Sequence, residues 1–211
     1  MLHTNTVTAE VLQLIRKLQE KSYLEEFYLV RETGLALQIG HRKSDDIDLF
    51  TNNDFDNNKV LERLEEDFEF QADQVEKNTI KGTVHGIKVD LLSHKYTLLD
   101  QIQNLEQIRI ASVRDIAAMI VNAVSNDGTR IKDFIDIYFL LEIYSLEDIL
   151  TFFSKKYKLR NSLHALKSLT YFQEVNLSDW PVIITNDKLS WKEICNRIEA
   201  ACRQYVESLN A

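Results

Sequence analysis

The chain has 211 residues, of which 45% are hydrophobic and 27% charged, the proportions of an ordinary globular protein. It contains no run of 18 apolar residues, and residues 1–10 lack a basic segment followed by an apolar one, so we expect neither a membrane span nor a signal peptide, and a cytoplasmic location. The net charge of −8 argues against a protein that mainly coats nucleic acid, although an acidic chain can bind RNA through a local patch, or a basic partner.

The first half of the chain mixes helical and strand patterns. Val11, Leu14, Ile15 and Leu18 recur at helical spacing and predict a helix over residues 8–21. Apolar runs and period-two alternation predict further elements. These are strands over 27–30, 46–51, 79–85 and 87–92, a short helix over 34–39 closed by Gly40, and a helix over 59–67.

After about residue 105 the chain looks helical. We expect helices over 113–124, 132–144 and 161–172. Ser145 with Asp148, and Ser190 with Glu193, have the spacing of capping boxes and predict two more helix starts. This order of elements predicts an α+β fold, in which a mixed β-sheet with flanking helices over 1–108 is followed by a helical bundle over 109–211.

The triplet Asp46-Ile47-Asp48 is the most informative feature for function. Aspartate is depleted in strands, and period two places Asp46 and Asp48 on one face. If that face is buried, a divalent cation such as Mg²⁺ would offset the repulsion and the desolvation of the two carboxylates. If it is exposed, both are simply solvated. Asp90, inside another apolar strand, favours the first interpretation, because carboxylates on adjacent strands form the usual cradle for metal-assisted phosphoryl chemistry.

Two longer blocks carry a family resemblance. The first block is residues 29–50, Leu-Val-Arg-Glu-Thr-Gly-Leu-Ala-Leu-Gln-Ile-Gly-His-Arg-Lys-Ser-Asp-Asp-Ile-Asp-Leu-Phe, and residues 115–119 and 128–141 form the second block. They resemble the AbiEii/AbiGii nucleotidyltransferase toxins, whose pattern is roughly Gly-Gly-Thr-x-Leu-x-Leu followed by His-Arg-x-Ser-x-Asp-Ile-Asp-Leu-Phe. The resemblance covers most of residues 25–145, and the His-Arg-x-Ser-x-Asp-Ile-Asp-Leu-Phe signature is its specific part.

The resemblance implies a polymerase-β-like nucleotidyltransferase fold and Mg²⁺-dependent transfer of a nucleotide from an NTP. It further implies an acceptor such as tRNA and the genetic setting of a toxin with a cognate antitoxin. By carry-over from the family's motifs, the metal ligands and catalytic acids are Asp46, Asp48 and Asp90. The same carry-over places seven residues near the nucleotide: Thr33, Arg42, Lys43, Ser44, Lys132, Asp133 and Asp136.

Two positions depart from the family pattern. Arg31-Glu32 stands where the family has Gly-Gly, which lets backbone N–H groups approach phosphate at a helix N-terminus. Ile120 stands where the family usually has a lysine, for which Lys132 is a candidate substitute. The retained acids favour an active nucleotidyltransferase. The departures favour a degenerate relative that keeps the fold and binds a partner, and a third hypothesis is a plain helical interaction protein.

Two further features have structural interpretations. Residues 155–160, Lys-Lys-Tyr-Lys-Leu-Arg, are either a solvated helix end, which we favour, or a contact to an RNA backbone. Cys195 and Cys202 are seven residues apart on an expected helix, about 10 Å by the helical rise, so they are expected to be reduced thiols.

Overall fold

The computed structural model describes residues 1–210, which form two compact units. The first unit comprises Met1–Tyr96 and Gln101–Ala111, and the second comprises Thr97–Asp100 and the chain from Ser112 onward. A boundary after residue 108 would cut through the last strand of the first unit. Within residues 1–210 no helix is both long and apolar enough to cross a membrane.

The first unit is built on a mixed sheet. Within the described residues it has seven strands in the order β3-β4-β5-β2-β1-β7-β6. The pairs β2–β5 and β1–β7 are parallel, and the remaining neighbours are antiparallel. The strands are β1 (Tyr28–Leu29), β2 (Ile47–Thr51), β3 (Gln71–Glu76), β4 (Thr79–Val84), β5 (Ile87–Ser93), β6 (Gln103–Leu105) and β7 (Ile108–Ile110).

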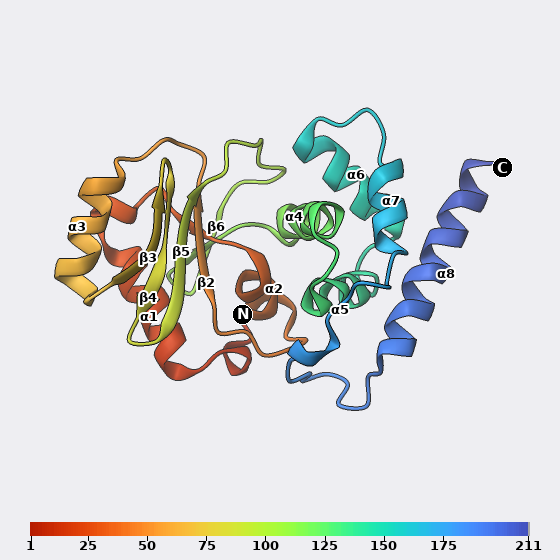
Figure 1. Cartoon of the computed structure of the whole chain (residues 1–211), viewed down its shortest axis with the longest axis horizontal. Helices are drawn as coiled ribbons and strands as arrows, with labels where there is room; N and C mark the ends of the chain where they lie inside the picture. Colours follow the sequence, from red (N-terminus) through yellow and green to blue (C-terminus); the bar gives the residue numbers. More distant parts are fainter. Residues whose placement is uncertain (211) are drawn as a thin grey trace. The chain divides into compact units, whose positions relative to one another are not determined.

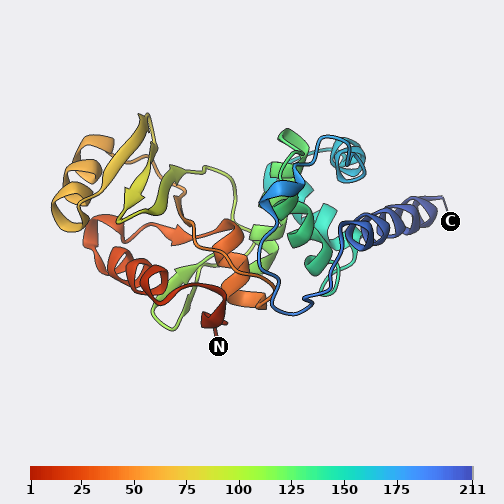
Figure 2. The same ribbon diagram turned by 60° about the horizontal axis from the view of Figure 1, so that its bottom comes forward.

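Three α-helices accompany the sheet: α1 (Ala9–Glu20), α2 (Arg31–Ile39) and α3 (Asn57–Phe68), with short 3₁₀ turns η1 (Thr4–Thr6) and η2 (Ser22–Leu24). Side-chain caps start two of them, because Thr8 accepts a hydrogen bond from the Val11 amide, and Asp56 accepts from two amides at the start of α3. The apolar stripes of α1 and α3 join one buried cluster with the strands. Figures 1 and 2 show these two helices next to each other against the sheet.

Alternation along the central strands separates an apolar face from a polar one. Leu49 of β2 and Leu91 of β5 are register partners, are fully buried, and belong to the core cluster. Asp48 and Asp90 are the register partners one residue earlier, so they point to the opposite face. The sequence expectation that the acids share one face of a strand thus holds for Asp48, whereas Asp46 lies in the loop just before β2.

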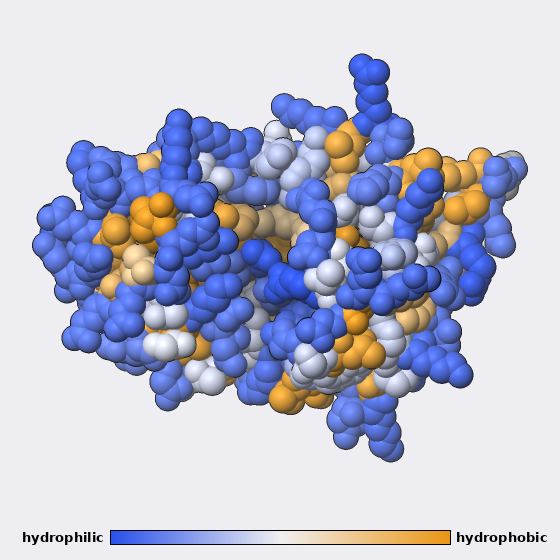
Figure 3. All heavy atoms as spheres, in the orientation of Figure 1, coloured by the Kyte–Doolittle hydropathy of each residue, from blue (hydrophilic) through white to orange (hydrophobic). Residues whose placement is uncertain are grey.

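The second unit is helical. Its elements are α4 (Val113–Asn126), α5 (Ile131–Leu140), α6 (Leu146–Tyr157), α7 (Leu163–Leu169), η3 (Leu177–Asp179) and α8 (Trp191–Leu209). The capping boxes predicted at Ser145 and Ser190 are confirmed, with both reciprocal bonds present in each. The rings of Phe134, Phe172 and Trp191 meet edge to face, with centroids 5.6–5.7 Å apart, and Phe134 is fully buried. Apolar residues reach the surface over α8 (Figure 3).

Several sequence expectations are corrected. The chain is not purely helical after residue 105, because β7 (Ile108–Ile110) pairs with β1 inside the sheet. Helix α2 begins at Arg31, three residues before the predicted start at Gly34. The basic run 155–160 is not a uniformly solvated end, since the side chain of Lys156 is only 1% exposed. Cys195 and Cys202 are free thiols, as expected.

Candidate functional site

Two buried carboxylates lie side by side on the polar face of the sheet. Asp48 of β2 and Asp90 of β5 are partners in a parallel ladder, and the residues are only 5% and 3% exposed. Their neighbours on the other face, such as Leu49, are locked in the core, so the register cannot slip without turning the apolar face outward. Asp90 Oδ1 is buried and has no hydrogen-bond partner among the described residues.

Three cationic side chains face this pair. Arg31 Nη1 lies 3.4 Å from Asp48 Oδ1, and Lys88 Nζ lies 3.6 Å from Asp90 Oδ2. Lys81 of β4 is the antiparallel register partner of Asp90 and therefore points to the same face. The two carboxylates are consequently surrounded by positive charge on both sides within the sheet unit.

Burial dominates the acidity of both groups. It raises the pKa of Asp48 to about 7, against the opposing attraction of Arg31, while repulsion from Glu32 and Asp90 adds to the rise. Burial also raises the pKa of Asp90, and Lys88 is the largest opposing influence. Burial therefore favours the protonated form of each acid, and a cation bound beside the pair would shift both toward the ionised form.

The N-terminus of α2 brings Arg31 to the pair. The amide of Val30 donates to the carbonyl of Asp48 at 3.0 Å, so the next residue starts the helix directly beside Asp48. Arg31 has a φ of 55°, in the left-handed region where glycine is favoured, at one of the two positions where the family pattern has glycine. Glu32 follows inside the first turn of α2 and is 4% exposed.

Four of the residues predicted to lie near the nucleotide belong to the sheet unit: Thr33, Arg42, Lys43 and Ser44. Thr33 Oγ1 bonds Ser44 Oγ at 2.8 Å and the carbonyl of Asp46 at 2.5 Å, which ties α2 to the loop before β2. Arg42 is buried, and its Nη1 donates to the carbonyl of Lys43 at 3.1 Å. Lys43 Nζ in turn donates to the carbonyl of Asn5 at 2.5 Å. In this conformation Thr33 and Ser44 shape the loop, and Arg42 is directed into the protein.

The remaining predicted residues belong to the helical unit. Asp133 and Asp136 lie on α5, are 1% and 0% exposed, and Asp133 Oδ1 is 3.9 Å from Arg130 Nη1. Lys132 Nζ bonds Asp179 Oδ2 at 2.8 Å. Ile120 is 3% exposed on α4, so an apolar side chain at this position is packed into the helical core.

The donor set suits a hard divalent cation with part of its shell left open. Mg²⁺ is held by one or two carboxylates together with substrate phosphates and water, and Asp48 and Asp90 provide two carboxylates with one oxygen unsatisfied. Residues 1–210 contain no arrangement of three His, Cys, Asp or Glu side chains able to hold one ion. Asp46 is partly exposed in the loop before β2.

Comparison with solved structures decides the fold. A candidate nucleotidyltransferase from H. pylori matches with a TM-score of 0.54 at 18% identity, over 95% of this chain and 94% of its own. JHP933 from Helicobacter pylori matches with a TM-score of 0.54 at 17% identity, over 99% and 96%. The chain shares its fold with these two proteins. The prediction of an α+β fold, with a mixed sheet and flanking helices followed along the chain by further helices, is confirmed.

Comparison of sequences finds a relative of unassigned function. An uncharacterized protein of Aquifex aeolicus, aq_aa25, is 27% identical over 202 residues, which span 93% of this chain and 96% of its own. No protein-family model matches the chain. The sequence analysis did not predict the cations around the pair. Strand alternation could have placed Lys81 and Lys88 on the same face as Asp90. The contact of Arg31 with Asp48 depends instead on the order of the strands.

Proposed function

We propose that the chain is a nucleotidyltransferase that transfers a nucleotide from an NTP to a hydroxyl-bearing acceptor. The observation that carries this proposal is the buried, in-register pair Asp48 and Asp90, with one carboxylate oxygen unsatisfied, on a nucleotidyltransferase fold. In this role the two carboxylates hold Mg²⁺, which supplies charge neutralisation at the transferring phosphoryl group. Asp46, in the loop just before β2, is proposed as a further metal ligand.

The surrounding residues have proposed roles consistent with their positions. Lys81 and Lys88 lie where they oppose the rise in the pKa of Asp90 and draw an anionic substrate toward the face. Thr33 and Ser44 hold the loop that precedes β2. From the helical unit, Asp133, Asp136 and Lys132 are proposed to border the nucleotide. The resemblance to AbiEii/AbiGii toxins supports tRNA as acceptor and an antitoxin as partner, and the proposed setting is the cytoplasm.

The direct test is transfer of label from each of the four NTPs, with Mg²⁺, onto total tRNA. Asp48→Asn and Asp90→Asn should each lower the rate by about 10²-fold or more, because each removes a charge that stabilises the transition state through the metal. Asp45→Asn is the matched control, since Asp45 is an exposed aspartate in the same loop region. Label that persists in Asp48→Asn at the wild-type rate would contradict the proposal.

A second candidate function is a degenerate relative that binds a partner without transfer. The specific observation favouring it is Arg31, whose guanidinium contacts Asp48 from a left-handed backbone position. Under this alternative, wild-type protein transfers no label from any NTP to tRNA. Restoring glycine at positions 31 and 32 would then produce transfer if those departures alone silenced the site.

A further inference from the structure

We propose that Arg31 is a built-in competitor of the divalent cation at the Asp48–Asp90 pair, so that the resting site is neutralised by protein rather than by metal. The inference rests on the metal site of the proposed function. It concerns a residue of this chain and predicts how tightly the pair binds metal, independently of whether transfer occurs.

The backbone fixes where Arg31 begins. Because Val30 N donates to Asp48 O, the α-carbon of the next residue lies at the level of Asp48, and the side chain reaches Asp48 Oδ1 at 3.4 Å. The side chain is still 31% exposed, whereas that of Asp48 is 7% exposed. The guanidinium is therefore in contact with solvent as well as with the buried carboxylate.

The conformation of Arg31 points the same way. A non-glycine residue with φ near +55° is strained, and such strain persists only where the surroundings hold it. Glycine would remove the strain and also the positive charge. An arginine at this position instead adds a fixed cation beside two carboxylates that otherwise repel each other.

The positive charge of Arg31 opposes binding of a divalent cation at the Asp48–Asp90 pair. Asp48 and Asp90 together carry two negative charges when ionised. Arg31 is the cation in contact with Asp48, whereas Lys88 contacts Asp90. A divalent ion placed at the pair would sit within a few ångströms of the guanidinium, where like charges repel strongly at the low effective dielectric of a buried face. Tight metal binding then requires the guanidinium to leave, and an anionic substrate phosphate provides an alternative partner for it.

The test measures binding of Mn²⁺ alone, as MnCl₂, by electron paramagnetic resonance. Arg31→Gln removes the charge and keeps much of the length, so its Mn²⁺ Kd should be lower than that of wild type by about tenfold or more. Arg31→Lys keeps the charge and should bind about as weakly as wild type. Arg63→Gln is the control, since Arg63 is an exposed arginine of α3 paired with Glu66.

Two further measurements test where the ion binds and whether each variant is folded. In the Arg31→Gln background, Asp48→Asn should abolish the tightened binding, which places the ion at the pair. Thermal unfolding of every variant checks that the fold is retained. Equal Mn²⁺ affinity in wild type and Arg31→Gln, equal tightening in Arg31→Lys, or no Mn²⁺ binding by any folded variant would each overturn the inference.

The outcome separates this inference from the proposed function. If Arg31→Gln binds Mn²⁺ tightly but neither protein transfers label from any NTP, the competition stands and the nucleotidyl-transfer proposal falls. If wild type transfers label and has the same Mn²⁺ affinity as Arg31→Gln, the nucleotidyl-transfer proposal stands and the competition falls.

Discussion

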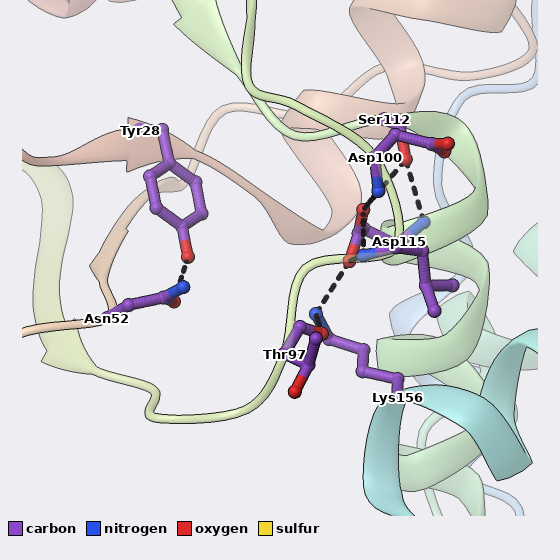
Figure 4. A network of polar contacts seen from close by, with 8 residues as sticks. Tyr28, Asn52, Thr97, Asp100, Ser112, Asp115 and Lys156 are labelled. Atoms are coloured by element: carbon purple, nitrogen blue, oxygen red, sulfur yellow. Dashed lines mark hydrogen bonds and ion pairs between the residues drawn. The ribbon is translucent and has the colours of Figure 1, made fainter.

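Lys156 Nζ lies 2.7 Å from Asp115 Oδ1, and the two side chains are 1% and 0% exposed. The carboxylate of Asp115 also accepts from the amides of Leu99 and Asp100 and from the Ser112 hydroxyl (Figure 4). This buried ion pair joins α4 to α6 and holds the segment Thr97–Asp100 against the helical unit. Every oxygen of the carboxylate is bonded, which is the condition under which a buried pair is tolerated.

Replacing Lys156 by Met should destabilise the helical unit by about 3–5 kcal/mol, because the substitution leaves Asp115 buried and charged without its partner. Lys155→Met is the matched control, since Lys155 is the exposed neighbour on the same helix, and it should change stability by less than about 0.5 kcal/mol. Urea unfolding followed by circular dichroism measures both. Similar losses in the two variants would show that the ion pair is not the cause.

Stability of the sheet unit should depend on pH through Asp48. Burial raises the folded pKa from 3.8 to about 7, so the folded state holds a proton that the unfolded chain releases. The free energy of unfolding therefore keeps its full value with respect to Asp48 below about pH 4, and it falls as the pH rises toward 7. Asp48→Asn should flatten this fall in the free energy of unfolding, whereas Asp45→Asn should not. Urea titrations in metal-free buffer between pH 4 and 8 measure the slope, and parallel slopes for wild type and Asp48→Asn would refute it.

Gly82 of β4 should not tolerate a side chain. A Cβ there would lie 2.1 Å from the carbonyl of Gln71 and 2.6 Å from the ring of Phe70, so backbone must move. Gly82→Ala should destabilise the protein by about 1–3 kcal/mol. Gly128→Ala is the comparison, because the Cβ would meet only the Val124 carbonyl, at 3.3 Å. A melting temperature unchanged by Gly82→Ala would contradict the close approach of β3 to β4.

The capping box of α8 can be tested alone. Ser190 Oγ accepts from the Glu193 amide, and the Glu193 carboxylate accepts from the amide and hydroxyl of Ser190. Ser190→Ala should lower stability by about 1 kcal/mol, the usual loss for an N-cap. Ser208→Ala, in the last turn of the same helix, should have an effect within about 0.5 kcal/mol. Chemical unfolding of the two variants distinguishes them, and equal losses would show that the cap contributes nothing specific.

Local patterns predicted much of the fold. The boxes at Ser145 and Ser190 start helices where expected, because capping depends on residues three apart in the chain. The alternation around Asp48 predicted a strand with an apolar face, because side chains on a strand alternate whatever its partners are. β7 was missed because a three-residue strand carries no periodicity, and its place beside β1 is set by pairing.

The sequence by itself determined the α+β order of elements, the helix starts and the presence of acids within apolar strands, since these depend on neighbours within a few residues. Only the tertiary structure decided that Asp90 is the register partner of Asp48, that Arg31 contacts Asp48, and that Lys156 is buried against Asp115. Each of these relationships joins residues 17 to 42 positions apart, where strand order and helix packing, rather than local preference, place the side chains.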